Sequence, residues 1–304
     1  MKHIPLLIVG GGPAGLTAAL YAGRGGIPVT LWEASSMPGG QMTTTPEIEN
    51  FPGVFKTDGF ALSEIMKKQA LELGAKIETQ KAVKFSLTPG HLQIDGERES
   101  VVAKTLILAM GVRRRKLGIP GEDRLLGRGV SFCAICDGHF FKGKKVAVAG
   151  GGSTALEEAL HLAELGCDVT LLHRRESFRG EADLLLRVRK NERITIATPY
   201  VLTAVEGDRF VTNVLAKHSQ TGKEMSLEVS ALFVCVGTVA NTELVSEILP
   251  LDEEGRILAG ETTQTNIPGV YAAGDIRQKP LYQIVTATAD GAVAAMKAGE
   301  FLGK

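Results

Sequence analysis

The order of apolar and polar positions along the chain predicts an α/β fold. Short apolar runs at residues 6–9 and 145–149 are each followed by a glycine-rich turn and then by a stretch with small residues at helical spacing. A second apolar run follows in both places and ends at Glu33 or at His173. The order strand, glycine turn, helix, strand is typical of βαβ units in parallel sheets. We therefore expect two such units.

The two units are copies of one pattern. Residues 9–34 and 149–174 align without a gap at an offset of 140 positions (149 − 9). Beyond the turns, Leu16, Ala19, Leu20, Gly26, Val29, Thr30 and Leu31 meet identical residues at Leu156, Ala159, Leu160, Gly166, Val169, Thr170 and Leu171. One glycine motif alone is weak evidence for a nucleotide site, but each copy here has its strand, its helix and its following strand. The sequence thus predicts an α/β protein with two Rossmann-like dinucleotide-binding domains.

The glycine turns have the chemistry of pyrophosphate sites. The first glycine permits a tight turn, the second lets the backbone approach the ligand, and the helix N-terminus offers free N–H groups and the positive end of a dipole. The residues expected to bind are Gly10, Gly12, Pro13, Ala14 and Gly15 in the first turn, and Gly150, Gly152, Ser153, Thr154 and Ala155 in the second.

The residue at the end of the second strand of each unit indicates which dinucleotide that unit binds. Glu33 can accept hydrogen bonds from a ribose diol and would repel a 2′-phosphate, which suits FAD or NAD. His173 is followed by Arg174, Arg175 and Arg179, a cluster that can neutralise a phosphate, which suits NADPH. The alternative for this cluster is a basic loop that only faces solvent.

Two further apolar strands and a C-terminal tail complete the pattern. The strands at residues 105–110 and 231–236 look like counterparts, each closing one unit. The tail from residue 257 onward carries another buried strand, which runs into Gly274 and Asp275. Since this tail has no counterpart in the second unit, the simplest topology returns it to the first domain.

The expected organisation is one domain inserted into another. The first domain comprises residues 1–114 and 244–304, and residues 115–243 form the insertion. The turn-rich crossings near residues 112–117 and 238–243 predict a hinge between them.

A pair of cysteines, Cys133 and Cys136, precedes the second glycine turn. Two cysteines separated by two residues can close a disulfide, and without signs of secretion such a pair is more often catalytic or metal-binding than structural. A structural zinc ion is the competing interpretation, but it needs four ligands, whereas Cys167 and Cys235 are isolated. We expect no metal, and we expect Cys167 and Cys235 to be small core residues.

Composition excludes several classes of protein. The 304 residues are 44% hydrophobic and carry a formal net charge of zero, which does not suit a nucleic-acid binder. No apolar run approaches the length of about 20 residues that a membrane-spanning helix needs. Four cysteines in a chain of this length fit a reducing compartment, so a cytoplasmic location is expected.

Taken together, these motifs resemble low-molecular-weight thioredoxin reductase. The resemblance spans nearly the whole chain and includes the two glycine turns, Gly39-Gly40-Gln41, the Cys-Ala-Ile-Cys-Asp-Gly segment at 133–138, the His-Arg-Arg segment with Arg179, and Ala-Ala-Gly-Asp at 272–275. The flavoprotein subunit of alkyl hydroperoxide reductase is similar but has an additional N-terminal redox region, and related ferredoxin–NADP reductases lack the cysteine pair.

The resemblance implies a reaction and its participants. NADPH would pass hydride to FAD, reduced FAD would reduce the Cys133–Cys136 disulfide, and the dithiol would reduce thioredoxin or a similar small redox protein. Cys136 would be the sulfur nearest the flavin, Cys133 would attack the substrate and Asp137 would donate or accept a proton. Asp137 has a second interpretation as a turn or helix-cap residue.

The resemblance also implies a homodimer, rotation of the inserted domain about its hinge, and further contacts to FAD. Those contacts would come from Gly40, Gln41, Asn50, Val83, Ala109, Gly111, Gly274, Asp275, Gln283 and Ile284. Several positions depart from the family pattern. Ile135 and Met110 stand where threonine is common, and Ser153-Thr154 stands where an acid followed by serine is frequent. Tyr282 stands where an arginine precedes the glutamine near the flavin.

Overall fold

The structure is a computed structural model that describes residues 1–45, 48 and 50–304. The chain divides into two compact units. Unit 1 comprises Met1–Arg113 and Val239–Lys304, and unit 2 comprises Arg114–Thr238. The expected boundaries were one residue later at the first crossing (114 against 113) and five residues later at the second (243 against 238).

A seven-stranded sheet forms the centre of unit 1. Strands β3, β2, β1 and β6 lie side by side in parallel, and β17 also pairs with β6 in parallel. Strands β4 and β5 form an antiparallel hairpin, and β5 pairs antiparallel with β6. The bounds are β1 Lys2–Val9, β2 Val29–Glu33, β3 Lys76–Thr79, β4 Ala82–Thr88, β5 His91–Gly96, β6 Ser100–Leu108 and β17 Val270–Ala272.

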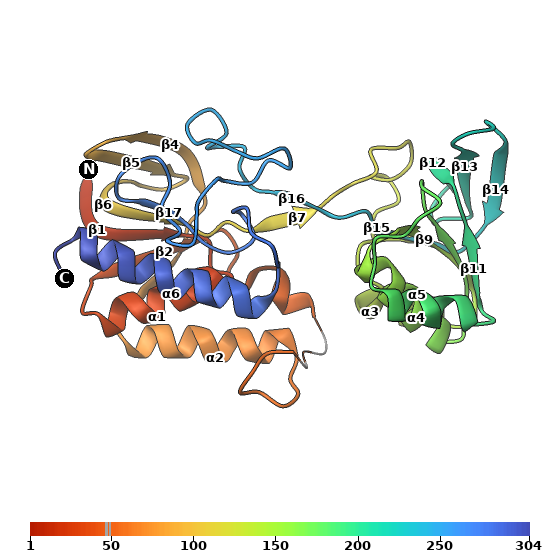
Figure 1. Cartoon of the computed structure of the whole chain (residues 1–304), viewed down its shortest axis with the longest axis horizontal. Coiled ribbons are helices and arrows are strands. Elements are labelled where there is room, and N and C mark those ends of the chain that lie inside the picture. Colours follow the sequence, from red (N-terminus) through yellow and green to blue (C-terminus); the bar gives the residue numbers. More distant parts are fainter. Residues whose placement is uncertain (46–47, 49) are drawn as a thin grey trace. The chain divides into compact units, whose positions relative to one another are not determined.

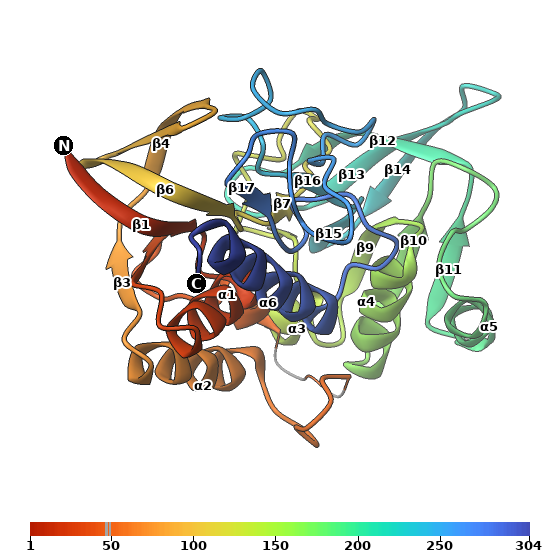
Figure 2. The ribbon, with the colours of Figure 1, turned by 60° about the vertical axis from the view of Figure 1, so that its left-hand side comes forward.

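Three helices cover one face of this sheet, as Figures 1 and 2 show from two sides. They are α1 (Pro13–Arg24), α2 (Gly59–Glu72) and α6 (Ile284–Phe301), and the short 3-10 helix η1 (Gly40–Thr44) precedes α2. Leu6 and Ile8 face these helices, whereas Leu7 and Val9 face the β4–β5 hairpin and the tail. This alternation places an apolar core on both faces of β1.

Unit 2 repeats the parallel architecture. Its sheet has the order β11-β10-β9-β15-β8 and is parallel throughout, and a separate antiparallel sheet has the order β12-β13-β14. The strands are β8 Val130–Ser131, β9 Lys145–Gly150, β10 Asp168–Leu172, β11 Ile194–Ala197, β12 Tyr200–Glu206, β13 Asn213–His218, β14 Glu224–Glu228 and β15 Ala231–Cys235. The helices are α3 Ala134–Asp137, η2 Gly138–Phe141, α4 Ser153–Glu164 and α5 Ala182–Lys190.

The predicted βαβ repeat is confirmed. Helices α1 and α4 both have 12 residues and begin 140 positions apart (153 − 13). The chain crosses between the units at β7 (Val112–Arg114) and β16 (Thr238–Ala240), which pair as a two-stranded sheet. Among the residues that the structure describes, no helix combines the length and the apolar character needed to cross a membrane.

Candidate functional site

The cysteine pair opens the short helix α3 in unit 2. Cys133 and Cys136 are joined by a disulfide, with their Cα atoms 5.3 Å apart. Cys133 is the N-cap residue, and its sulfur accepts a hydrogen bond from the amide of Cys136 at 3.2 Å. Cys136 is exposed and Cys133 is half-buried. The disulfide predicted from the spacing is therefore present.

Asp137 is connected to this pair through a residue that no sequence motif indicated. The buried hydroxyl of Ser131 donates to Oδ2 of Asp137 at 2.7 Å and accepts from the amide of Cys133 at 3.0 Å. The side chain of Asp137 caps no helix. Asp137 therefore stands at the N-cap position of η2 without a side-chain capping bond, because its carboxylate is directed to the Ser131 hydroxyl.

The first glycine turn, in unit 1, leaves no room for a side chain at Gly10 or Gly15. A Cβ on Gly10, whose φ is +107°, would lie 2.3 Å from the carbonyl oxygen of Ala109, and a Cβ on Gly15 would lie 1.8 Å from the carbonyl oxygen of Gly10. Gly12 faces open space, since the nearest atom to its Cβ position is 4.0 Å away, in Gly40. This cradle at the N-terminus of α1 fits a pyrophosphate.

Glu33 lies at the end of β2 as predicted, with its carboxylate turned to the glycine turn. Its Oε2 accepts from the amide of Gly11 at 2.6 Å and its Oε1 accepts from the amide of Ser35 at 2.8 Å. These bonds fix an acceptor beside the turn, as binding of a ribose diol requires. Gln80 follows the end of β3, and its backbone amide donates to the carbonyl of Glu33. Val83 lies three residues further on, in β4, and is exposed.

The other residues expected at FAD come from five segments of unit 1, at residues 40–41, 50, 109–111, 274–275 and 283–284. Gln41 lies in η1, and its side chain donates to the carbonyl of Val112. Asn50 donates from its side chain to the side chain of Gln283 at 3.2 Å, and Gln283 is the N-cap residue of α6, immediately before Ile284. The structure thus brings Asn50 and Gln283 together although they are 233 positions apart (283 − 50).

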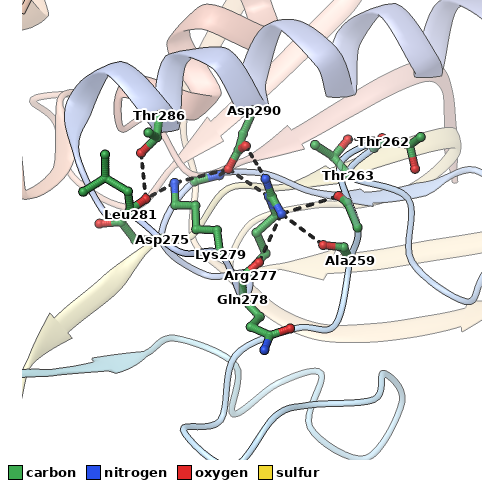
Figure 3. A network of polar contacts seen from close by, with 12 residues as sticks. Ala259, Thr262, Thr263, Asp275, Arg277, Gln278, Lys279, Leu281, Thr286 and Asp290 are labelled. Atoms are coloured by element: carbon green, nitrogen blue, oxygen red, sulfur yellow. Dashed lines mark hydrogen bonds and ion pairs between the residues drawn. The ribbon is translucent and has the colours of Figure 1, made fainter.

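A buried ion network holds the segment that carries Gly274 and Asp275 (Figure 3). Asp290 of α6 accepts from the amide of Gly274 at 3.0 Å and from Arg277 at 2.9 and 2.6 Å. Lys279 bridges Asp290 at 3.2 Å and Asp275 at 3.3 Å. Asp290, Arg277 and Lys279 were not anticipated from the sequence, since no motif distinguishes them from surface charges.

The second glycine turn has the same construction in unit 2. A Cβ on Gly150 would lie 2.3 Å from the carbonyl oxygen of Cys235, whereas a Cβ on Gly152 would meet nothing within 4 Å. The turn ends at Ser153, the first residue of α4, with Thr154 exposed and Ala155 buried behind it. The fit to a second dinucleotide is therefore the same as in the first copy.

His173 and the three arginines differ in their surroundings. His173 is buried beneath Gly151, where a Cβ would touch its ring at 2.4 Å. Burial lowers the pKa of His173, and the charges of Arg174, Arg175 and Arg179 act in the same direction. The three arginines are exposed. The arginines are therefore the charged groups here that a phosphate could reach, while the ring of His173 packs under the turn.

A buried carboxyl group of α4, that of Glu158, reaches the start of α3. The thiol of Cys235 donates to Oε2 of Glu158 at 3.0 Å, and the backbone of Ala134 also hydrogen-bonds this carboxylate. Burial raises the pKa of Glu158. Cys167 and Cys235 are both buried free thiols, as expected.

Comparisons with known proteins agree with this geometry. A family model described as pyridine nucleotide-disulphide oxidoreductase matches residues 4–291. The chain is 42% identical to a bifunctional thioredoxin reductase/thioredoxin of Mycobacterium leprae over 98% of its own length and 65% of that protein. It is 40% identical to a thioredoxin reductase of Mycolicibacterium smegmatis, covering 98% of this chain and 96% of that protein. The solved structure of Lactococcus lactis thioredoxin reductase superposes with a TM-score of 0.91 at 38% identity, covering 99% of both chains.

Proposed function

Because the chain belongs to the pyridine nucleotide-disulphide oxidoreductase family, we propose that it is an NADPH-dependent, FAD-containing thioredoxin-disulfide reductase. One observation carries the proposal. The Cys133–Cys136 disulfide lies in unit 2, together with the second glycine turn and the arginine cluster. The first glycine turn, with Glu33, lies in unit 1. A nucleotide reductant, a flavin and a disulfide are the three components that this reaction needs.

The first cradle would hold FAD. Gly10, Gly12 and Gly15 would receive the pyrophosphate and Glu33 the ribose, while Asp275, Gln283 and Ile284 would lie along the rest of the molecule. When bound, FAD accepts hydride from NADPH and supplies two electrons to a disulfide. The network around Asp290 keeps Gly274 and Asp275 in place for this contact.

The disulfide and its neighbours would perform the sulfur chemistry. Two electrons and two protons break the bond between Cys133 and Cys136 and leave two thiols. The thiolate of Cys133 then attacks the substrate disulfide, and Cys136 displaces the substrate thiol, which reforms the original bond. Asp137, oriented by Ser131, would deliver and remove the protons.

The second cradle would hold NADPH through its phosphates. Arg174, Arg175 and Arg179 would bind the 2′-phosphate, since guanidinium groups form paired hydrogen bonds to phosphate oxygens. His173 would act by supporting Gly151. This division of roles supports a preference for NADPH over NADH.

We propose three further properties with the same function. Both the disulfide and NADPH must reach the flavin, so unit 2 would rotate about β7 and β16 during turnover. Fluorescent labels on the two units should change their energy transfer when NADPH is added, and unchanged transfer during turnover would refute the rotation. The enzyme would act in the cytoplasm, where reducing conditions suit the free thiols of Cys167 and Cys235.

The third property is a homodimer. An apolar groove of about 330 Å³ lies in unit 1 between α1, α2 and residues 51–54, next to Phe55, which is 98% exposed. Apolar surface of this kind supports association with a second copy. Light scattering on the purified protein should give twice the chain mass, and replacement of Phe55 by serine should weaken the association.

Anaerobic titration with NADPH tests the function. The purified protein should bleach its flavin and release two thiols, and it should then reduce thioredoxin. With Cys136→Ser, bleaching should persist while thiol release and thioredoxin reduction stop. A preparation that binds no FAD on reconstitution would refute the proposal. If the reduced protein instead reduced a glutaredoxin-like protein or a peroxidase but not thioredoxin, the proposed cofactor chemistry would stand and only the identity of the acceptor would change.

A further inference from the structure

Arg256 is buried against the ring of Tyr282 in unit 1. Its guanidinium carbon lies 3.9 Å from the ring centroid, and the residue is 6% exposed. This is the stacked geometry in which an aromatic face attracts a cation. Tyr282 is the residue that replaces the family's arginine, and it directly precedes Gln283.

The backbone brings Arg256 to this position. The carboxylate of Asp252 accepts from the amides of Glu254 and Arg256 at 2.9 Å each, closing a turn at Gly255. The following residue, Ile257, then pairs with the chain around Arg277, its amide donating to the carbonyl of Ile276 at 2.9 Å. Arg256 is thereby held alongside the segment that begins at Asp275.

Arg256 contacts both ends of that segment. Its Nη1 donates to the carbonyl of Asp275, and its guanidinium plane covers Tyr282. The amide of Lys279 donates to the Tyr282 hydroxyl at 3.4 Å. Residues 275–282 thus form a loop that Arg256 clamps at its start and at its end.

Charge explains why residue 282 is aromatic here. Arg277 and Lys279 already pair with the carboxylates of Asp290 and Asp275, and Arg256 pairs with Glu254 at 3.6 Å. A second guanidinium at position 282 would lie against buried Arg256, and like charges repel strongly where water is excluded. A tyrosine face is attracted to the same cation.

We propose that Arg256 and Tyr282 form one positioning pair, in which the cation of Arg256 packs on the ring of Tyr282 and fixes the loop between Asp275 and Gln283. This inference rests on the proposed placement of FAD at Asp275, Gln283 and Ile284. It concerns a cation and a ring that act through the loop, so neither residue is assigned a part in the chemistry.

Reciprocal substitution tests the pair, with FAD affinity of the deflavinated protein and the absorption spectrum of bound flavin as readouts. Arg256→Leu and Tyr282→Leu should each weaken FAD binding roughly five- to tenfold. Tyr282→Arg should weaken it further, because it sets two guanidiniums together. The double variant Arg256→Tyr with Tyr282→Arg should recover affinity and spectrum to within about threefold of the original.

Controls make the outcome decisive. Tyr282→Phe keeps the ring and should bind FAD as the original does, and Lys144→Leu, which removes a cation–ring contact with Phe141 in unit 2, should change nothing. If the single variants do not fold, Arg256→Lys serves, with a smaller loss of affinity expected. Single variants that bind FAD like the original, or a double variant no better than the weaker single one, would overturn the inference. If instead the original protein binds no FAD, or Asp275→Ala does not weaken it, the proposed FAD site itself is refuted.

Discussion

The thiol of Cys235 is hydrogen-bonded to the carboxylate of Glu158 at 3.0 Å, inside the core of the unit that carries the redox disulfide. Burial raises the pKa of both groups, and the negative charge of Glu158 raises that of Cys235 further. The carboxylate also meets the backbone of Ala134, one residue after Cys133. The carboxyl group of Glu158 in α4 therefore also contacts α3, the helix that carries Cys136.

Glu158 should make stability depend on pH. Its carboxyl keeps a proton to higher pH in the folded protein than in the unfolded chain, where the ordinary pKa is 4.5. The folded state thus binds more protons above pH 4.5, so the stabilising contribution is full below that pH and is lost as pH rises through the folded pKa. The glutamine of the Glu158→Gln variant cannot ionise. The free energy of unfolding of this variant, minus that of the original protein, should therefore increase as the pH rises above 4.5.

Denaturant unfolding at a series of pH values measures this effect. Glu164→Gln, at the exposed end of the same helix, is the matched control and should follow the original protein at every pH. A constant difference between Glu158→Gln and the original across the series would show that Glu158 has the same pKa in both states.

The arginine cluster should determine coenzyme choice. Replacing Arg174 and Arg175 by alanine should raise the dissociation constant for NADPH by one to two powers of ten for each arginine replaced, at about 1.5–3 kcal/mol per charged hydrogen bond. NADH, which lacks the phosphate, should bind with nearly unchanged affinity. Titration calorimetry of both coenzymes measures the difference, and Arg187→Ala with Arg189→Ala on α5 is the control. Equal losses for NADPH and NADH would contradict the assignment.

Substitutions at two glycines of the second glycine turn should have different effects, one mainly on stability and the other mainly on NADPH binding. Gly150→Ala places a Cβ 2.3 Å from the carbonyl of Cys235 at a φ of +157°, and should cost at least about 2 kcal/mol of stability. Gly152→Ala meets nothing within 4 Å, so as a helix-cap change it should cost at most about 1 kcal/mol. Gly152→Ala should nevertheless raise the NADPH dissociation constant at least about tenfold, because the open space is where the pyrophosphate is expected. Thermal melts measure the effect on stability, and coenzyme titration measures the effect on binding. If Gly152→Ala bound NADPH as tightly as the original protein, the pyrophosphate would not lie at this turn.

The parts predicted from sequence are those that a local pattern specifies. The offset of 140 residues fixes both βαβ units, since strand period, glycine turn and helix spacing are all local. The same holds for the Cys133–Cys136 disulfide, whose spacing alone permits closure. His173 lies one residue beyond the end of β10, which was predicted to end at this histidine, and its burial under Gly151 depends on the fold of the turn around it.

The parts that were missed depend on tertiary packing that no local pattern specifies. Ser131 reaches Asp137 because β8 adds to the sheet edge beside β15, which no local pattern reveals. Glu158 and Cys235 are 77 positions apart, and a glutamate on a helix is more often exposed. Arg256 belongs to no sequence motif, and its side chain is buried on Tyr282.

Ser131 should control the proton transfers at the redox disulfide. Ser131→Ala removes the 2.7 Å hydrogen bond to Asp137 while keeping the backbone of β8, so it should slow thioredoxin reduction roughly tenfold and shift the pH profile of kcat. Asp137→Asn should slow it by about a hundredfold, within the range for loss of a general acid or base. Flavin bleaching by NADPH should be unaffected in both, because neither residue belongs to the nucleotide cradles. Stopped-flow absorbance separates the two half-reactions, with Asp183→Asn on α5 as control. If Ser131→Ala matched the original in rate and pH profile while Asp137→Asn did not, Asp137 would act without the hydroxyl, and the hydrogen bond would serve only the fold of α3.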